Sequence, residues 1–475
     1  MPLPVISVEE MRAWEESSWR AGRKERDVIA TVGRIVAERA LKMTKDDDRI
    51  LVLAGKGNNG NDARAAIGHL LRRRVKLIDV NDPAAAFDEV SHLLEKRPLL
   101  IDGLFGIGLN RALAPEWVRL IERINAAELQ VLAIDVPSGL NATTGTPEGA
   151  AIRASVTLTI GAVKRAILAQ SAWDYVGRLE VAPDIGLIPA TVDARNSELL
   201  WSIESDFSEF QRRQRPASSH KGTFGHVAIL AGSLGYHGAA VLAARGAQGA
   251  HPGLVTLITQ SDSYVPVASQ LQSAMVHRWP THPKVEELCT ALVVGPGLAS
   301  QLLPEELRVE VKRLWRELRQ PMIVDASALA WLELADSTEF VRVVTPHPGE
   351  AARMLGVSTA DVQADRVSAV RKISQKFGGC WVVLKGHQTL VGRSQGPVFV
   401  NSSGNPFLAQ GGSGDVLAGF LGGLLAQPFL QKDIDVTVRF AVWAHGAAAD
   451  WLSARQGRWT VEELAGEVSV VGPRA

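Results

Sequence analysis

The sequence is poor in cysteine, in unbalanced charge and in long apolar runs, and each shortage excludes a class of protein. Its 475 residues include 2 cysteines, Cys289 and Cys380, which lie too far apart in the chain for a Cys-x-x-Cys metal or redox site. They provide no disulfide framework, which is typical of a protein from a reducing compartment. Lys and Arg number 51, as do Asp and Glu. No net charge therefore draws the chain to nucleic acid or to an anionic membrane.

Long apolar segments and metal-binding histidine motifs are also missing. The longest nearly apolar stretch, residues 416–426, contains three glycines and is far shorter than the ~20 residues of a membrane span. Glu9 and Glu10 stand where a secretory signal would be apolar. None of the 11 histidines occurs in a His-Glu-x-x-His pattern. We therefore expect a cytoplasmic protein without membrane or nucleic-acid partners.

Short apolar runs alternate with helical patterns through both halves of the chain. The runs begin at Arg49, Val75, Pro98, Val131, Val156, His226, Leu254, Ala291, Met322, Arg342 and Trp381. Continuous runs of this kind are typical of parallel strands buried on both faces. A polar stretch near residue 210, with Arg212, Arg213 and Arg215, interrupts the pattern. We predict an α/β protein with a Rossmann-like doubly wound domain in residues 1–210 and a second α/β domain in residues 211–475.

A glycine-rich loop follows the first strand of the predicted N-terminal domain. Gly55, Gly57 and Gly60 form Gly-x-Gly-x-x-Gly between a strand and a helix, and Asp79 ends the next strand. This pattern lets the backbone and a helix N-terminus approach a pyrophosphate, while an acid at that distance accepts from a ribose hydroxyl. A tight turn without a ligand is the alternative. The context favours dinucleotide binding.

Two more loops follow strands of the same domain, at residues 102–111 and 135–141. Such strand-ending aspartates often cap turns, but two of them facing a nucleotide loop favour a ligand site. The side-chain oxygens of Asn59, Asp102 and Ser138 are suited to a hard monovalent or divalent cation. The sequence therefore predicts a cation cage at these strand ends.

The most specific motif lies in the second half, where Gly411, Gly412, Ser413 and Gly414 precede Asp415 and an apolar helix. The free amides and the dipole of a helix N-terminus favour an anion there. Asp415, in the first turn, is placed to accept a proton from a hydroxyl that is being phosphorylated. Helix capping is the alternative role. We predict a phosphate cradle with a base.

Other strand ends of the second half carry polar residues. His347 lies between two prolines, Lys385 follows a buried strand where it can meet phosphates, and Thr389 can donate to them. His445 fits a packed helical histidine better than a catalytic one. No Gly-x-x-x-x-Gly-Lys-Ser/Thr occurs, which excludes a P-loop.

These motifs identify the chain as similar to the bifunctional NAD(P)H-hydrate repair enzymes. The first half resembles the NAD(P)H-hydrate epimerase domain through Asn-Asn-Gly, Asp-Gly-Leu-Phe-Gly-x-Gly-Leu-x-Arg and Asp-x-Pro-Ser-Gly. The second resembles the ribokinase-like, ADP- or ATP-dependent (S)-NAD(P)H-hydrate dehydratase through His-Lys-Gly-Thr-Phe-Gly, Thr-Pro-His-Pro-Gly-Glu and Gly-Asn-Pro-Phe-Leu-Ala-Gln-Gly-Gly-Ser-Gly-Asp. The resemblance implies a lyase and isomerase for metabolite repair.

The resemblance also implies site residues, with Asp415 and Asp135 catalytic. The residues that contact the hydrated nucleotide would be Asn58, Asn59, Gly60, Asn61, Asp62, Gly106, Ile107, Gly108, Leu109, Asn110, Arg111, Ala112 and Asp135 in the first half, and Ala240, Gly297, His347 and Asp415 in the second. Those that contact ADP or ATP would be Lys385, Gly386, His387, Gln388, Thr389, Gly411, Gly412, Ser413 and Gly414. Asn59, Asp102 and Ser138 would hold potassium, Mg²⁺ would accompany the nucleotide, and the chain would form a homo-oligomer.

This sequence departs from the family pattern in the glycine-rich loop, where Asn61 and Ala63 replace glycines. Asn61 either crowds the ligand or requires a left-handed backbone. An N-terminal half that binds without catalysis is therefore one alternative. A ribokinase-like kinase for a small hydroxylated metabolite is another, because an anion site with an aspartate serves any hydroxyl acceptor. ADP and ATP, and NADH-hydrate and NADPH-hydrate, are equally consistent with the sequence.

Overall fold

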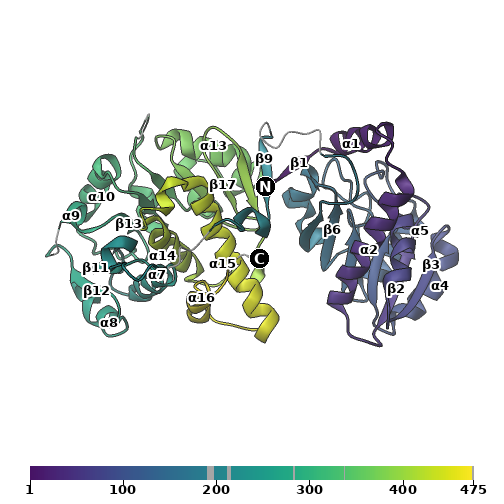
Figure 1. The fold of residues 1–475 in the computed structure, drawn as a ribbon, viewed down its shortest axis with the longest axis horizontal. Helices are drawn as coiled ribbons and strands as arrows, with labels where there is room; N and C mark the ends of the chain where they lie inside the picture. The colour runs from purple at the N-terminus through teal and green to yellow at the C-terminus, as the bar shows by residue number, and fades with distance from the viewer. Residues whose placement is uncertain (190–196, 211–214, 282–283, 336, 338, 473–475) are drawn as a thin grey trace. The chain divides into compact units, whose positions relative to one another are not determined.

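The computed structural model describes residues 1–189, 197–210, 215–281, 284–335, 337 and 339–472, and it divides into two units (Figure 1). One unit is Leu3–Ser197, and the other is Glu198–Ala475 with Met1–Pro2. Arg212 and Arg213 of the predicted boundary lie outside the described residues. Strand β9 (Leu199–Ser202), which the predicted domain 1–210 includes, pairs with a strand of the second unit.

Strands and helices alternate in the first unit, and the five strands expected there are present. Its elements are β1 (Leu3–Ile6), α1 (Val8–Arg20), α2 (Glu25–Met43), β2 (Arg49–Ala54), α3 (Asn58–Ala66), β3 (Arg74–Asp79), α4 (Pro83–Leu94), β4 (Leu99–Gly103), α5 (Pro115–Asn125), β5 (Val131–Ile134), β6 (Val156–Ile160), β7 (Val163–Lys164), α6 (Trp173–Val176) and β8 (Arg178–Ala182).

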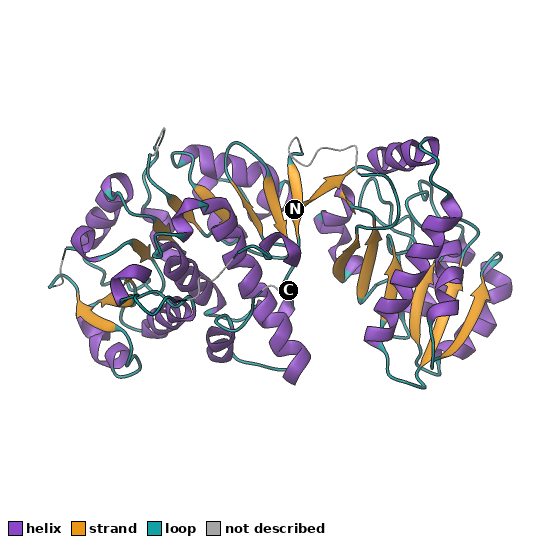
Figure 2. Ribbon diagram, viewed as in Figure 1, coloured by secondary structure: helices purple, strands orange, loops and turns teal. Residues whose placement is uncertain are grey.

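The main sheet of this unit is parallel, in the order β3-β2-β4-β5-β6-β8. Alternate residues of β2 enter two different cores: Ile50 and Val52 pack with α1 and α2, whereas Leu51 and Leu53 pack with α4 and α5. Both faces are therefore buried, which explains the continuous apolar runs. Figure 2 shows the helices on both sides of the strands. The doubly wound fold predicted from the sequence is confirmed.

The second unit also alternates strands and helices, and all six strands predicted for it are present. Its elements are β9, β10 (His226–Leu230), α7 (His237–Gly249), β11 (Leu254–Thr259), α8 (Tyr264–Ala268), β12 (Met275–Arg278), α9 (Val285–Leu288), β13 (Ala291–Val294), α10 (Glu305–Glu317), β14 (Met322–Val324), β15 (Arg342–Val344), α11 (Pro348–Leu355), α12 (Thr359–Ala364), α13 (Arg366–Lys376), β16 (Trp381–Leu384), β17 (Leu390–Gly392), β18 (Val398–Asn401), α14 (Ser413–Leu425), α15 (Ile434–Gln456) and α16 (Val461–Glu467).

The sheet of the second unit has the order β12-β11-β10-β13-β14-β15-β16-β17-β18-β9. Its strands are parallel from β12 to β16, and β17 pairs antiparallel with both β16 and β18. The strand order reverses at β10, whose neighbours are β11 and β13. The loops after β10 and β13 therefore leave the sheet on either side of a reversal point, which is where open α/β sheets bind ligands.

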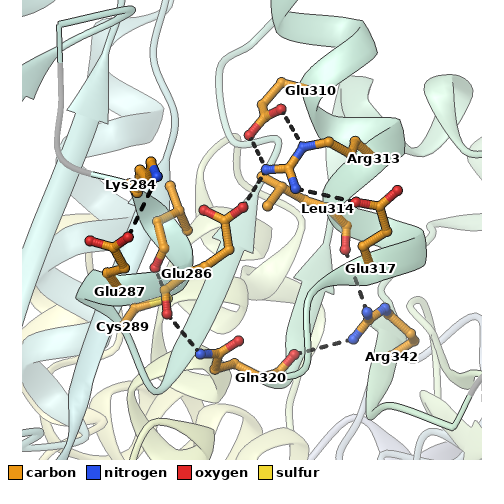
Figure 3. Close-up of polar contacts among 11 residues, drawn as sticks. Lys284, Glu286, Glu287, Cys289, Glu310, Arg313, Leu314, Glu317, Gln320 and Arg342 are labelled. Atoms are coloured by element: carbon orange, nitrogen blue, oxygen red, sulfur yellow. Dashed lines mark hydrogen bonds and ion pairs between the residues drawn. The ribbon is translucent and has the colours of Figure 1, made fainter.

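A buried arginine fastens α10 to the sheet (Figure 3). The guanidinium of Arg342, at the start of β15, donates to the carbonyl oxygens of Leu314, Trp315 and Gln320 at the end of α10 and beyond it. Carbonyl groups at the C-terminal end of a helix have few partners within the helix, and a cation complements the dipole at this end. Burial without a counter-ion lowers the pKa of Arg342 to about 10, so the side chain stays charged.

Among the described residues, no helix combines the length and apolar character needed to cross a bilayer.

Candidate active sites

A cavity of about 870 Å³ lies at the carboxyl ends of the strands of the first unit, where the strand order reverses between β2 and β4. The loops after these strands form most of its wall, and α1 contributes Arg12 and Glu15. The residues predicted to contact a nucleotide that line it are Asn58, Asn59, Asp62, Gly106, Ile107, Gly108, Leu109, Asn110, Arg111, Ala112 and Asp135. The structure thus brings three separate motifs to one ligand-sized cavity.

Two glycines of the first loop are required by backbone packing. A Cβ on Gly55 would lie 2.0 Å from the carbonyl oxygen of Leu104, and a Cβ on Gly60 would lie 2.0 Å from that of Gly55. Gly57 has open space around it and precedes α3 as its N-cap. These contacts hold α3 against the sheet, and its first residues, Asn58 and Asn59, therefore reach the cavity.

The residues that depart from the family loop face away from this cavity. Asn61 lies within α3 without the left-handed backbone considered for it, and its Oδ1 accepts from Arg64 Nη1 at 3.0 Å. Ala63 is fully buried against β4. Arg64 Nε also donates to Asp79 Oδ1 at 2.8 Å, so Asp79 is held by an arginine and does not line the cavity where a ribose was expected.

The predicted cation ligands are linked through the backbone of Phe105, and one of their oxygens has no hydrogen-bond partner. Asn59 Nδ2 donates to the Phe105 carbonyl oxygen at 2.8 Å, which leaves the buried Asn59 Oδ1 without a hydrogen-bond partner. Ser138 Oγ donates to Asp102 Oδ1 at 2.6 Å and accepts from the Phe105 amide at 2.8 Å. Burial raises the pKa of Asp102 to about 6. Carboxylate, amide, hydroxyl and carbonyl oxygens fit a hard cation.

Asp135 is held in an unusual conformation by a lysine that the sequence analysis missed. Its backbone has φ = 65°, the left-handed region that costs a non-glycine residue about 1–2 kcal/mol. The Asp135 carboxylate accepts from the Ile160 amide at 3.1 Å, from Thr159 Oγ1 at 3.2 Å and from the ammonium of Lys164. Lys164 is fully buried. The single lysine in the Gly-Ala-Val-Lys segment after β6 was the available signal.

Carboxylates gather around this ion pair. Asp62 and Glu15 line the same cavity, and burial together with the charge of Asp135 raises both pKa values, that of Asp62 to about 8. Lys164 forms a buried ion pair with Asp135. The cavity therefore offers a carboxyl whose pKa is raised beside a carboxylate paired with an ammonium, an arrangement suited to donating and accepting a proton.

The residues predicted to form the phosphate cradle of the second unit lie at the N-terminus of α14. Gly412 is the N-cap with φ = 99°, and Asp415 lies in the first turn of the helix. Ser413 Oγ donates to the Leu408 carbonyl oxygen at 2.8 Å. His445 Nε2 donates to the Ser413 carbonyl oxygen at 2.9 Å, and burial lowers the pKa of His445 to about 4. His445 is thus the packed, neutral histidine that we expected, and it supports the cradle.

Helix α14 approaches α7 at backbone contact distance. A Cβ on Gly419 would lie 1.8 Å from the Ala243 carbonyl oxygen, and a Cβ on Gly246 would lie 2.2 Å from that of Val416. Every residue of α14 from Val416 onward is buried. Close packing of α14 on α7 therefore fixes the start of α14, in addition to the hydrogen bond from Ser413 to the loop before it.

Strand ends place charged groups beside the cradle. Lys385, after β16, donates from Nζ to Asp325 Oδ1 at 2.7 Å, and Asp325 follows β14. A Cβ on Gly414 would lie 3.1 Å from Lys385 Nζ, so the ammonium lies next to the first turn of α14. Burial and the charge of Asp325 raise the pKa of Asp415 to about 7, against the opposing effect of Lys385. An aspartate that titrates near neutrality is suited to act as a base.

His347 and the loop 385–389 lie at neighbouring strand ends. His347 is the N-cap of α11: its Nδ1 accepts from the Gly349 amide at 3.0 Å, and its Nε2 lies 3.4 Å from Glu350 Oε1. Gly386 and Gln388 have positive φ, and Thr389 Oγ1 donates to the Gly386 carbonyl oxygen at 3.2 Å. The hydroxyl of Thr389, which was predicted to donate a hydrogen bond to a phosphate, thus donates to the carbonyl of its own turn.

Gly297 and Ala240, which were also predicted to contact the hydrate, differ in how close they lie to the strand reversal. Gly297 follows β13, and its carbonyl oxygen accepts from Ser233 Oγ, on the loop after β10, at 2.6 Å. Ala240 is fully buried in α7 and packs under that loop. Gly297 is therefore at the strand reversal, whereas Ala240 shapes the loop from below.

Two family models match the chain. The model described as NAD(P)H-hydrate dehydratase matches residues 227–469, and the model described as YjeF-related protein N-terminus matches residues 76–166. The first match covers most of the second unit. The second covers the central part of the first unit, which includes residues 106–112 and Asp135 but not residues 58–62.

Relatives of known name align over most of the chain. A bifunctional NAD(P)H-hydrate repair enzyme of Escherichia coli is 33% identical over 86% of this chain and 81% of its own length. One of Coxiella burnetii is 32% identical over 93% of each chain. A solved ribokinase-like superfamily protein from Enterococcus faecalis superposes with a TM-score of 0.51 at 26% identity, over 57% of this chain and 95% of its own. The predicted ribokinase-like fold of the second half is confirmed.

Proposed function

The chain belongs to the bifunctional NAD(P)H-hydrate repair enzymes, and we propose that each of its two units carries one of the two reactions. It is an enzyme that interconverts the R and S hydrates of NADH and NADPH and dehydrates the S hydrate to the reduced nucleotide. Residues 1–210 would hold the epimerase and residues 211–475 the dehydratase. The kinase alternative, with an inert N-terminal half, has no support from these relatives.

The dehydratase reaction begins at the hydroxyl on C6 of the hydrated ring. Asp415 takes the proton of this hydroxyl as its oxygen attacks the terminal phosphorus of ADP or ATP, and AMP or ADP leaves. The amides of Gly411 to Gly414 hold the charge that develops on the transferred group. The C6–O bond then breaks, phosphate departs, and loss of a proton from C5 restores the ring double bond.

The residues around the cradle would bind two ligands, the adenine nucleotide and the hydrate. Lys385 to Thr389 and Gly411 to Gly414 would bind the adenine nucleotide, and Gly297 and His347 would contact the hydrate, with Ala240 beneath. Carboxylate oxygens beside the cradle are of the kind that Mg²⁺ prefers, so Mg²⁺ would enter with the phosphates. The ammonium of Lys385, adjacent to Gly414, supports this division.

In the first unit, Asp135 would move the proton during epimerisation. The C6–O bond must break and form again on the opposite face of the ring, so one proton is delivered to the departing hydroxyl and one is removed from the returning water. Asn58 to Asp62 and Gly106 to Ala112 would hold the nucleotide. The buried ion pair between Asp135 and Lys164 supports a proton-transfer role at this position.

Potassium is the cation that we propose for Asn59, Asp102 and Ser138. The orphaned Asn59 Oδ1 is the observation that supports a bound cation, because a buried amide oxygen without a partner is costly. No group of three or more His, Cys, Asp or Glu side chains suited to a metal occurs among the residues that the structure describes. Bound potassium would supply positive charge and rigidity beside the cavity.

The position of Asp415 within the anion cradle carries the dehydratase assignment. We expect Asp415→Asn to abolish phosphate release that depends on S hydrate and ADP, because the amide cannot accept the hydroxyl proton. The melting temperature should stay unchanged. Normal turnover in this variant would refute the assignment.

The epimerase assignment has its own test. Asp135→Ala should lose the interconversion of R and S hydrates and keep the dehydration of pure S hydrate. Preserved interconversion would refute the role of Asp135, and assay of R hydrate alone would show whether the first unit only binds.

The compartment and the oligomeric state are also proposals. Both cysteines are buried and unpaired, which fits our proposal of a cytoplasmic enzyme. A homo-oligomer stays a prediction from the family resemblance.

A further inference from the structure

We infer that Asp325, held by Thr345, is a positioning residue that fixes the ammonium of Lys385 over the first turn of α14. The inference rests on the proposed dehydratase function and adds two residues to it. Neither was assigned a role in binding or catalysis from the sequence.

The three residues come from three adjacent strands. In the parallel register Val324 of β14 pairs with Val344 of β15, so that Asp325 and Thr345 follow their strands side by side. The Lys385 amide, at the end of β16, donates to the Pro346 carbonyl oxygen at 2.9 Å. The sheet therefore delivers a carboxylate, a hydroxyl and an ammonium to one place without any contribution from a mobile loop.

One oxygen of the Asp325 carboxylate accepts both side-chain hydrogen bonds, and the other oxygen faces Gly414. Asp325 Oδ1 accepts from Thr345 Oγ1 at 2.7 Å and from Lys385 Nζ at 2.7 Å. Asp325 is 1% exposed, so these hydrogen bonds leave the side chain little freedom. Oδ2 is directed toward the cradle, 3.9 Å from the position of a Cβ on Gly414.

The arrangement has a clear consequence for Lys385. Lysine is a flexible point charge whose side chain would otherwise adopt many rotamers. The bond to Oδ1 holds Nζ beside Gly414, where the transferred phosphoryl group is expected to lie, and Glu350 Oε2 lies 4.0 Å from Nζ on another side. A cation that is already in position before the reaction stabilises developing charge without reorganisation.

The backbone next to Asp325 supports a functional role. Ala326 has φ = 52°, a left-handed conformation that a non-glycine residue adopts at a cost of about 1–3 kcal/mol. Gly295, whose Cβ would lie 1.8 Å from the Asp325 carbonyl oxygen, accommodates this bend. Strain kept beside a buried charged group fits a site that must be held in one geometry.

The test is a double-mutant cycle on dehydration of S hydrate with ADP, using Asp325→Asn, Lys385→Met and the double variant. Asp325→Asn should lower kcat about 100-fold, the typical cost of a misplaced group in an active site. Asp262→Asn, an exposed aspartate of the same unit, is the matched control and should keep the wild-type kcat. In the Lys385→Met background, Asp325→Asn should change kcat by less than about 3-fold. Independent effects that multiply in the double variant would overturn the inference.

Two further readouts separate positioning from loss of fold. The charge of Asp325 raises the pKa of Asp415 and of Lys385, and Asp325→Asn removes this charge. The acidic limb of the pH profile of kcat/KM, set by Asp415, and the alkaline limb, set by Lys385, should therefore both move to lower pH. Thr345→Val should lower kcat, and Thr345→Ser should restore it, with melting temperatures near that of the wild type. Unshifted limbs, or failure of Thr345→Ser to rescue at a normal melting temperature, would contradict the inference. Absence of turnover in the wild type would instead refute the proposed function.

Discussion

At the scale of single residues, three left-handed backbones mark the ends of strands where polar side chains meet. Asp135, Ala326 and Gln388 all have positive φ without being glycine. Each lies in or beside a segment to which a site role is assigned. Such conformations persist only where surrounding contacts compensate for them, and at Asp135 the compensation comes from three donors, including the buried Lys164.

The raised pKa of Asp415 predicts the pH dependence of dehydration. The base must be ionised, and burial raises its pKa to about 7, so kcat/KM for S hydrate should fall about tenfold per unit of pH below that value. Initial rates with pure S hydrate and saturating ADP would measure this. A profile that stays flat through pH 7 would argue against Asp415 as the base.

The orphaned Asn59 oxygen predicts a response to potassium. Potassium chloride should raise the melting temperature of the first unit relative to choline chloride at equal ionic strength, since the ion binds the folded state only. Asn59→Ala should abolish the difference, because it removes the unpaired ligand. An equal response of variant and wild type would place the ion elsewhere.

The residues that sequence reasoning identified and those it missed differ in a physical way. The sequence identified the residues whose side chains are short and therefore stay close to their own backbone, at strand ends and at a helix start. These are Asn59, Asp102, Ser138 and Asp415. Lys164 and Arg64 were missed because long side chains reach partners that only the fold brings near. The ion pair between Asp79 and Arg64 could not be predicted for the same reason.

At the scale of elements, the dehydratase site depends on how closely α14 packs on α7. Gly419→Ala places a Cβ where the Ala243 carbonyl oxygen lies, and the strain should cost about 1–3 kcal/mol. We expect a lower melting temperature of the second unit and weaker ADP binding, because the cradle moves with its helix. Calorimetry would measure both.

The matched control is Gly466→Ala on α16, where a Cβ meets nothing within 4 Å. This change should leave ADP binding intact. If the two alanine variants behave alike, close packing of α14 is not what fixes the cradle.

Strand positions were predictable because continuous apolar runs leave few alternatives. All eleven runs correspond to strands. The strands β17 and β18 were missed because they are short and extend the sheet by antiparallel pairing. The search for continuous apolar runs detects strands of a parallel sheet. Strand β7 is only two residues long, yet it delivers Lys164.

At the scale of the whole molecule, two sites on two units predict separable activities. Asp135→Ala and Asp415→Asn should each fail to convert R hydrate to NADH when ADP is supplied. A mixture of the two variants should convert it, because S hydrate made by one is dehydrated by the other. Formation of reduced nicotinamide would be followed by its absorbance. No recovery in the mixture would show that both activities depend on one intact chain.

The most direct measurement is the stoichiometry of dehydration by the wild-type enzyme with purified S hydrate and ADP. Phosphate, AMP and reduced nicotinamide nucleotide should form in equal amounts, since each phosphoryl transfer at the α14 cradle ends in expulsion of phosphate. Accumulation of a phosphorylated hydrate without recovery of the reduced nucleotide would contradict this mechanism.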